Sequence, residues 1–292
     1  MKKSLLFALA AVLALSCGDA NSNYVRKAIR IMDRNGLFAE GPEWESAREK
    51  ALADTPASLE EAQEIIREAG KVAGGKHTFL KPADAVAEDA ASKEWEMPTV
   101  TIGEDGIAII KLPPFSGNRE EGVKYASAVL DAVPDTLKGV VIDLRDNRGG
   151  NMYPMIAAVH RFIPDDDALR FRTRKRTQWI QLQFVVQGAG VGRLSRIECP
   201  VALLTNEWTA SSGEATLLCF RGLDYTRVFG GPTAGYASAN QPFPLPDGAS
   251  LVLTTGCDVA RTGEVFCDDP IEPDVITETP LEDAVEWIKE NC

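Results

Sequence analysis

Polar and apolar residues follow a helical period in the first part of the chain. The segment "SLEEAQEIIREAGKVA" (residues 58–73) carries one apolar stripe of helical spacing. The members of this stripe are Ala62, Ile65, Ile66 and Ala69. Ser58 precedes the stripe and Glu61 stands three residues later, a pair that predicts a capping box at the start of a helix. We expect residues 25–82 to form a small N-terminal helical domain.

A different pattern begins at residue 99, where short apolar runs alternate with helical segments. The runs "GIAIIKLPPF", "GVVIDLRDN" and "CPVALLTN" are typical of buried strands. Helical patterns follow at residues 118–133, 151–163 and 212–222. This alternation predicts an α/β domain with a largely parallel sheet over residues 99–292. The acidic, alanine-rich residues 83–98 are predicted to connect the two domains.

The N-terminus has the pattern of an export signal. "MKKSLLFALAAVLALSC" contains two lysines, an apolar stretch too short to remain across a bilayer, and then Cys17. It resembles a bacterial lipoprotein signal, with Ala14 where such signals usually have leucine. We predict a signal peptide over residues 1–16, lipidation of Cys17 and a tether over residues 17–24, with plain secretion as the alternative. The protein would then be lipid-anchored to a bacterial membrane on its periplasmic or cell-surface side.

The net charge limits the kinds of partner. A formal net charge of −12 provides no basic face for phosphates, which excludes nucleic acid as a partner. The densest basic run, "RFRTRKR" at residues 170–176, follows three aspartates. We predict that it forms a solvated hairpin or strand. A site for a substrate carboxylate is the alternative.

Cysteine and histidine usage argues against a bound metal. The chain has no CxxC motif and only two histidines, so we expect neither a metal nor another cofactor. Cys257 and Cys267 bracket a predicted hairpin, and a disulfide between its strands is one open possibility. Five cysteines remain besides Cys17, so at least one is free or pairs outside the chain.

Two adjacent serines mark a junction between a strand and a helix. Ser211 and Ser212 follow the predicted strand "PVALLTN" and precede the helical run "GEATLLCFRG". This position exposes a side chain at the carboxyl edge of a sheet, beside the free N–H groups of a helix. The local pattern also fits a simple helix N-cap. Gly149 and Gly150 follow another strand, and their amides could face an anion.

Five motifs occur in an order that resembles a known family. They are "IDLRDNRGGN", "NEWTASSGEA", "FGGPTAG", "PLPDGASL" and "IEPD", all within residues 100–277. This order is similar to that of the C-terminal-processing and tricorn-core serine peptidases, which implies a crotonase/Clp-protease-like layered core. In that family the nucleophile lies three residues before a glutamate, and counting back from Glu214 gives Ser211. One branch pairs this serine with a lysine, but the corresponding residue here is Tyr236.

The other branch of the family uses a histidine from the N-terminal part of the chain. "GGKHTFLKP" supplies His77 at the corresponding place. His160, the second histidine, is predicted to be a surface residue or a charge partner near a helix end. The resemblance therefore implies that His77 accepts the proton of Ser211, since an imidazole titrates near neutrality.

The resemblance also implies the other parts of the site. The expected oxyanion donors are the amides of Ser212 and of Gly149 or Gly150. A third catalytic group is expected near "IEPD", where Glu272 is the candidate. Many relatives insert a PDZ domain ahead of the core, but the segment between residues 80 and 100 is too short to hold one.

Two functions remain open at this point. The first is an exported serine peptidase that hydrolyses peptide bonds through a Ser211/His77 acyl-enzyme. The second is a catalytically inactive protein that binds a peptide, lipid or glycan in the same cleft. In the first case the partner is a peptide or protein substrate, and the membrane is contacted only through the N-terminal lipid.

Overall fold

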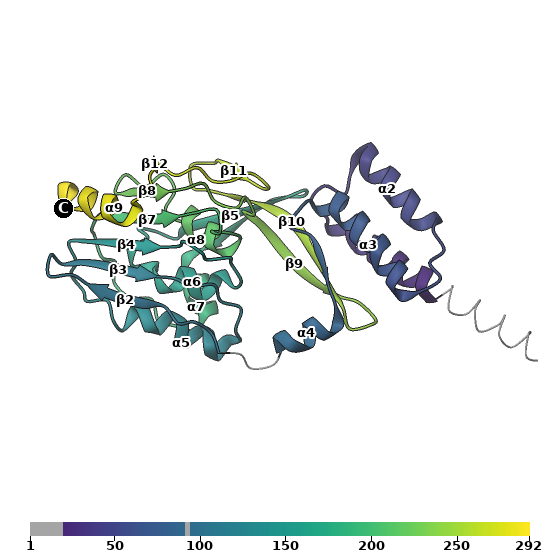
Figure 1. The fold of residues 1–292 in the computed structure, drawn as a ribbon, viewed down its shortest axis with the longest axis horizontal. Coiled ribbons are helices and arrows are strands. Elements are labelled where there is room, and N and C mark those ends of the chain that lie inside the picture. Colours follow the sequence, from purple (N-terminus) through teal and green to yellow (C-terminus); the bar gives the residue numbers. More distant parts are fainter. Residues whose placement is uncertain (1–19, 91–93) are drawn as a thin grey trace, which may run out of the picture. The chain divides into compact units, whose positions relative to one another are not determined.

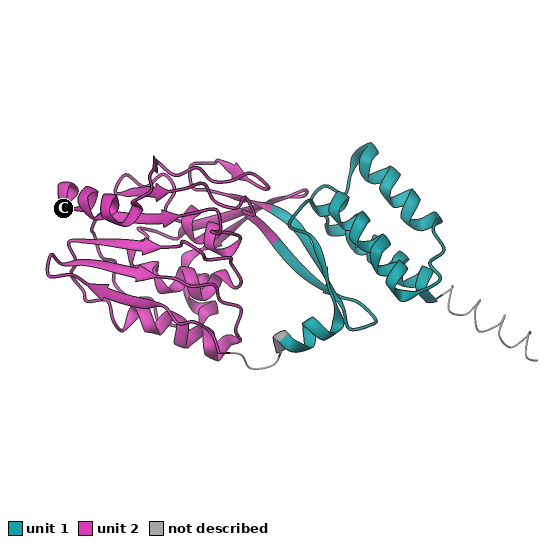
Figure 2. Cartoon of the chain, in the orientation of Figure 1, with its two compact units in different colours: residues 1–91, 240–256 teal, residues 92–239, 257–292 magenta. Residues whose placement is uncertain are grey.

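The computed structural model describes residues 20–90 and 94–292, and the predicted signal peptide and Cys17 lie outside these residues. Figure 1 shows the elements along the chain, and Figure 2 colours its two compact units. Unit 1 comprises Met1–Ala91 and Asn240–Gly256, and unit 2 comprises Ser92–Ala239 and Cys257–Cys292. The chain therefore returns to unit 1 before it completes unit 2.

Unit 1 consists mainly of helices. Its described elements are a helix over residues 20–35, α2 (Gly41–Ala53), α3 (Leu59–Gly74), β1 (Phe79–Lys81) and α4 (Ala83–Ala90). At the start of α3, the Ser58 hydroxyl accepts the amide of Glu61 at 3.1 Å, which confirms half of the predicted capping box. The Glu61 carboxylate accepts the amide of Ala57 at 2.8 Å. Of the predicted apolar stripe on α3, Ala62, Ile66 and Ala69 are buried and Ile65 is half-buried.

Two strands carry the chain back into unit 1. They are β9 (Ser238–Pro244) and β10 (Ser250–Val259), which pair with each other. β1 pairs with β10 in antiparallel fashion, with Leu80 opposite Leu251. Leu251 and Leu253 are buried in the core that the helices of unit 1 form. Residues 240–256 thus supply a hairpin to that core.

Unit 2 is an α/β fold around a six-stranded sheet, which confirms the predicted fold class. Its strand order is β12-β8-β7-β4-β3-β2, and all neighbours are parallel except β2 and β3. The strands are β2 (Thr99–Ile102), β3 (Ile107–Lys111), β4 (Gly139–Asp143), β7 (Val201–Thr205), β8 (Thr226–Gly230) and β12 (Val275–Ile276). Because β4, β7 and β8 are parallel, the loops that follow them meet at one edge of the sheet.

Helices cover both faces of this sheet. They are α5 (Arg119–Leu130), α6 (Met152–Ala158), the 3₁₀ helix η1 (His160–Phe162), α7 (Leu182–Ala189), α8 (Ser212–Leu218) and α9 (Pro280–Asn291). Ala284 and Ile288 of α9 pack with Val141 and Leu204, whereas α5, α6, α7 and α8 contribute to the core on the opposite face. A Cβ at Gly139 would lie 2.2 Å from Ile288, so this glycine permits the close approach of α9.

The remaining strands form hairpins. β5 (Asp167–Thr173) and β6 (Thr177–Gln181) pair in antiparallel fashion around residues 170–176, which confirms the predicted hairpin. β11 (Val265–Phe266) pairs with the end of β10, and a Cys257–Cys267 disulfide joins the two strands. Among the described helices, none is both long and apolar enough to cross a bilayer.

Candidate active site

Ser211 stands between β7 and α8 in a strained conformation. Its φ of 53° and ψ of −114° lie where residues other than glycine are rarely found. Such strain persists only where neighbouring contacts maintain it, and it is concentrated at functional sites. The contacts here come from the preceding turn, where the Thr209 hydroxyl donates to the Leu144 carbonyl at 2.9 Å. The next amide, that of Ala210, donates to the Asn147 carbonyl at 2.9 Å.

The two adjacent serines have different surroundings. Ser212 is 8% exposed, and its hydroxyl donates to the Gly150 carbonyl at 2.7 Å. Ser211 is only half-buried. The Ser212 hydroxyl therefore ties α8 to the glycine loop after β4, and Ser211 is the better candidate for a nucleophile.

The carboxylate of Glu214 organises this junction. Glu214 is fully buried and accepts the amides of Ser211 at 2.7 Å, Gly235 at 2.9 Å and Tyr236 at 2.8 Å. It also accepts the hydroxyl of Thr233. Burial raises the pKa of Glu214, and these hydrogen bonds oppose the rise. One side chain thus fixes the backbone of Ser211 and the loop after β8, a role that the sequence interpretation missed.

The glycine loop after β4 lies directly against Ser211. Gly149 has a φ of 91°, and a Cβ there would lie 2.7 Å from the Ser211 Cβ. Gly150 has a φ of 123°, and a Cβ there would lie 2.0 Å from the Phe115 carbonyl oxygen. Both positions therefore require glycine, because they combine left-handed backbone with close contacts.

The three predicted oxyanion donors are not equivalent. The amide of Gly149 donates to the Asn147 side chain at 2.9 Å and already has an acceptor. Ser212 is the first residue of α8, so its amide has no acceptor within the helix. The geometry thus favours Ser212 and Gly150 over Gly149 as donors to an oxyanion.

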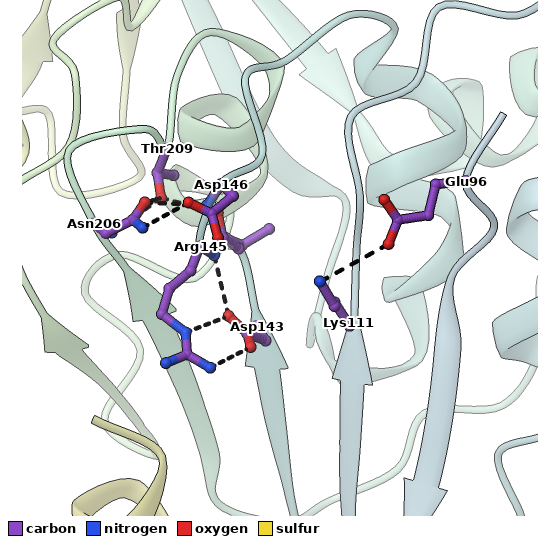
Figure 3. A network of polar contacts seen from close by, with 8 residues as sticks. Glu96, Lys111, Asp143, Arg145, Asp146, Asn206 and Thr209 are labelled. Carbon is purple, nitrogen blue, oxygen red and sulfur yellow. Dashed lines mark hydrogen bonds and ion pairs between the residues drawn. The ribbon is translucent and has the colours of Figure 1, made fainter. Parts of the chain in front are cut away.

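Polar contacts link the loops after β4 and β7 (Figure 3). The Asp146 amide donates to the Asn206 side chain at 3.0 Å, and the Asn206 amide group donates back to the Asp146 carboxylate at 3.0 Å. The Arg145 guanidinium donates two hydrogen bonds to the Asp143 carboxylate, at 2.9 and 2.7 Å, and the Arg145 backbone amide donates a third at 3.1 Å. Together with Thr209, these contacts hold the glycine loop and the serine turn in one arrangement.

His77 belongs to unit 1, whereas Ser211 belongs to unit 2. The histidine lies in the turn between α3 and β1 and is half-buried. Its carbonyl accepts a hydrogen bond from the Asn240 side chain at 2.9 Å. The pairing of His77 with Ser211 stays a prediction.

The structure corrects the prediction for His160. This residue is 2% exposed, so it is not a surface residue. Its Nδ1 lies 2.6 Å from the Ala157 carbonyl, and its Nε2 accepts the amide of Leu194 at 2.9 Å. Burial lowers the pKa of His160, and these partners fit a neutral ring with the proton on Nδ1. His160 therefore serves the packing of unit 2.

Glu272, the predicted third group, lies in the loop before β12. Its side chain is exposed, and its carbonyl accepts a long hydrogen bond of 3.5 Å from Arg221. The neighbouring Ile271 is the residue that reaches the site region, because its amide donates to the Thr233 hydroxyl at 2.8 Å. The role of Glu272 stays a prediction.

Comparison with known proteins identifies the relatives of this chain. The model of peptidase family S41 matches residues 106–277. The nisin-resistance protein of Lactococcus lactis subsp. lactis is 32% identical over 313 residues, which cover 98% of each chain. The carboxy-terminal-processing protease of Bartonella bacilliformis is 29% identical over 147 residues. That match covers 50% of this chain and 32% of the protease, so this chain spans about a third of its length.

Two solved structures share the fold. A lipoprotein from Streptococcus agalactiae superposes with a TM-score of 0.83 at 30% identity, covering 92% of this chain and 96% of that protein. The photosystem II D1 C-terminal processing protease superposes with a TM-score of 0.63 at 13% identity, covering 88% and 93%. The second likeness concerns the fold alone.

Proposed function

This chain belongs to peptidase family S41 and is a serine-type peptidase, and on that premise we propose that Ser211 is its nucleophile and His77 its general base. The observation that carries the proposal is the contrast between the two serines. Ser212 uses its hydroxyl to bind the Gly150 carbonyl, while the strained Ser211 lies against Gly149. A serine between a strand and a helix, in strained backbone, is a recurrent setting for a nucleophile.

The reaction proceeds through an acyl-enzyme. Ser211 Oγ attacks the carbonyl carbon of the peptide bond while His77 accepts its proton. The amides of Ser212 and Gly150 donate to the oxyanion of the tetrahedral intermediate. His77 then protonates the leaving amine as the C–N bond breaks, and a water molecule hydrolyses the ester to regenerate Ser211.

Glu214 has a positioning role in this scheme. It touches neither the substrate nor the transferred proton, but it holds the Ser211 amide and the loop that carries Tyr236. Because the amide of the nucleophile is already bound to this carboxylate, the oxyanion site is left to its neighbours. The inactive binding protein is the less favoured alternative.

The relatives suggest the class of substrate. The name of the Lactococcus lactis protein concerns resistance to nisin, and its match extends over almost the whole of both chains. We propose that this chain cleaves nisin or a similar antimicrobial peptide. Export with a lipid on Cys17 would put the enzyme where such peptides reach the cell, and the S. agalactiae relative is described as a lipoprotein.

The proposal is tested with a fluorophosphonate probe and with nisin as substrate. We expect the protein to be labelled, and we expect mass spectrometry to find two fragments whose masses sum to nisin plus one water. Ser211→Ala abolishes both results, whereas Ser212→Ala keeps most of the labelling. His77→Ala slows both reactions by about 10²- to 10⁴-fold, the usual contribution of a general base.

Three outcomes would contradict this assignment. Equal labelling of Ser211→Ala would exclude it as the nucleophile. An inactive Tyr236→Phe protein beside an active His77→Ala protein would exclude His77 as the base. Binding of nisin without labelling or cleavage would favour the inactive binding protein.

A further inference from the structure

The turn that carries His77 is bound by one asparagine. Asn240, in β9, donates from its Nδ2 to the His77 carbonyl at 2.9 Å. Its Oδ1 accepts the hydroxyl of Thr254, from β10, at 2.8 Å. All three residues lie in unit 1. The asparagine thus bridges the turn after α3 and the returning hairpin.

A chain of buried donors fixes the orientation of the Asn240 amide. The hydroxyl of Thr78 donates to the Thr254 hydroxyl at 3.2 Å and accepts the Thr254 amide at 2.9 Å. Thr254 is 0% exposed and Thr78 is 7% exposed. The His77 carbonyl can only accept, so the NH₂ group of Asn240 must face it, and the amide oxygen then faces the Thr254 hydroxyl as its acceptor.

We propose that Asn240 is a positioning residue for His77 and that Thr254 orients its amide. The inference rests on the proposed function, because Asn240 has this role only if His77 is the base. Asn240 contacts neither the substrate nor the transferred proton. It fixes the carbonyl of His77 and thereby the backbone from which the imidazole extends.

The test replaces single atoms of this cluster. Asn240→Asp removes the NH₂ donor and keeps an acceptor for Thr254. We expect kcat for nisin hydrolysis to fall by about 10- to 100-fold, because small misplacements of catalytic groups are costly. KM should stay within about threefold, since substrate binding is not altered. The concentration of active sites is measured by titration with the fluorophosphonate to completion, and each rate is divided by that concentration. Unfolded protein therefore does not lower the measured kcat.

Three further variants separate orientation from packing. Thr254→Val removes the orienting hydroxyl and lowers kcat as well. Thr254→Ser retains the hydroxyl and restores kcat relative to Thr254→Val. Gln241→Ala changes the exposed neighbour of Asn240 on the same strand and leaves kcat unchanged. Equal kcat for Thr254→Val and Thr254→Ser would overturn the role of Thr254, even if Asn240→Asp failed to fold.

The two histidines supply a direct readout of position. NMR of the imidazole Cε1–H groups gives two resonances, one for His77 and one for the buried His160. Asn240→Asp should shift the His77 resonance and leave that of His160 in place. A parental kcat with an unshifted His77 resonance would overturn the inference about Asn240. Full activity of His77→Ala would instead overturn the proposed function.

Discussion

The backbone amide of Ser211 and the side chain of Glu214 form a hydrogen bond of 2.7 Å across the first turn of α8. The same carboxylate also accepts from the loop after β8. A capping interaction that is local in sequence has thus become the link between two loops of the site. The strained φ of Ser211 is maintained by this arrangement.

Glu214→Gln should damage the site without changing the size of the side chain. An amide has one oxygen, so its NH₂ group would face donors that now bind a carboxylate. We expect the free energy of unfolding to fall by about 1–3 kcal/mol, the cost of leaving buried donors unpaired. Urea titration measures this loss, and kcat for nisin should fall with it. Glu207→Gln, at an exposed position in the preceding turn, is the matched control. Equal behaviour of the two variants would contradict the role of Glu214.

Gly149→Ala should abolish most of the activity through a steric clash. The new Cβ would lie 2.7 Å from the Ser211 Cβ, on a backbone with a φ of 91°. We expect kcat/KM to fall by at least about 100-fold, because displaced catalytic groups lose that much rate. Gly192→Ala is the control, since a Cβ there meets nothing within 4 Å. A Gly149→Ala enzyme as active as Gly192→Ala would show that the loop can move away without consequence.

The buried carboxyl of Asp258 should make the stability of the protein depend on pH. Asp258 is 2% exposed, and its Oδ1 has no hydrogen-bond partner among the described residues. Burial raises the pKa of this carboxyl well above 3.8, and the nearby charge of Glu214 raises it further. Above about pH 4 the unfolded chain loses this proton while the folded chain retains it. The folded state then binds more protons, so the free energy of unfolding falls as pH rises.

Asp258→Asn should flatten that dependence. The amide cannot ionise, so the variant loses less stability than the parent between about pH 4 and pH 8. Urea unfolding of both proteins across this range measures the difference in slope. For each unit by which the pKa of Asp258 in the folded state exceeds its value in the unfolded chain, the free energy of unfolding falls by about 1.4 kcal/mol across this range. Parallel curves for the two proteins would mean that Asp258 ionises in the folded protein as it does in the unfolded chain.

Cys17→Ala tests the predicted anchor. If Cys17 carries a lipid, the variant should move from the membrane fraction to the soluble fraction and lose incorporation of labelled fatty acid. Its rate of nisin cleavage in detergent should match that of the parent, because the lipid supplies no chemistry. Cys292→Ala, at an exposed position near the other end, should remain in the membrane fraction. A parent protein that is released without any lipid label would point to plain secretion.

The sequence predicts features that depend on neighbouring residues. The cap formed by Ser58 and Glu61 spans three residues, and the disulfide between Cys257 and Cys267 closes a short hairpin. The cap follows from local spacing, whereas the spacing of the two cysteines left the disulfide as one possibility. The parallel strands could also be predicted from the sequence, because strands that are buried on both faces consist of continuous apolar runs.

Features that depend on distant segments were missed. His160 is buried because a later loop covers it, and the Leu194 amide of that loop donates to its ring. The pattern of apolar residues around His160 gives no information about a loop more than 30 residues away. Ser211 and Glu214 have the spacing of a capping box, so the hydrogen bond from the Ser211 amide to the Glu214 carboxylate could have been predicted from the sequence. Its contacts with residues 233–236 join segments that only the folded sheet brings together. The sequence analysis likewise assigned residues 240–256 to the α/β domain, whereas in the structure they belong to unit 1.

This return also sets the order in which the chain can fold. The N-terminal helices bury their apolar faces partly against Leu245, Leu251 and Leu253, which are among the last parts of the chain to be synthesised. Until they emerge, the first helices lack part of their core and cannot complete a stable unit. The discontinuous core of unit 1 therefore delays the folding of the N-terminal helices until most of unit 2 has also been made.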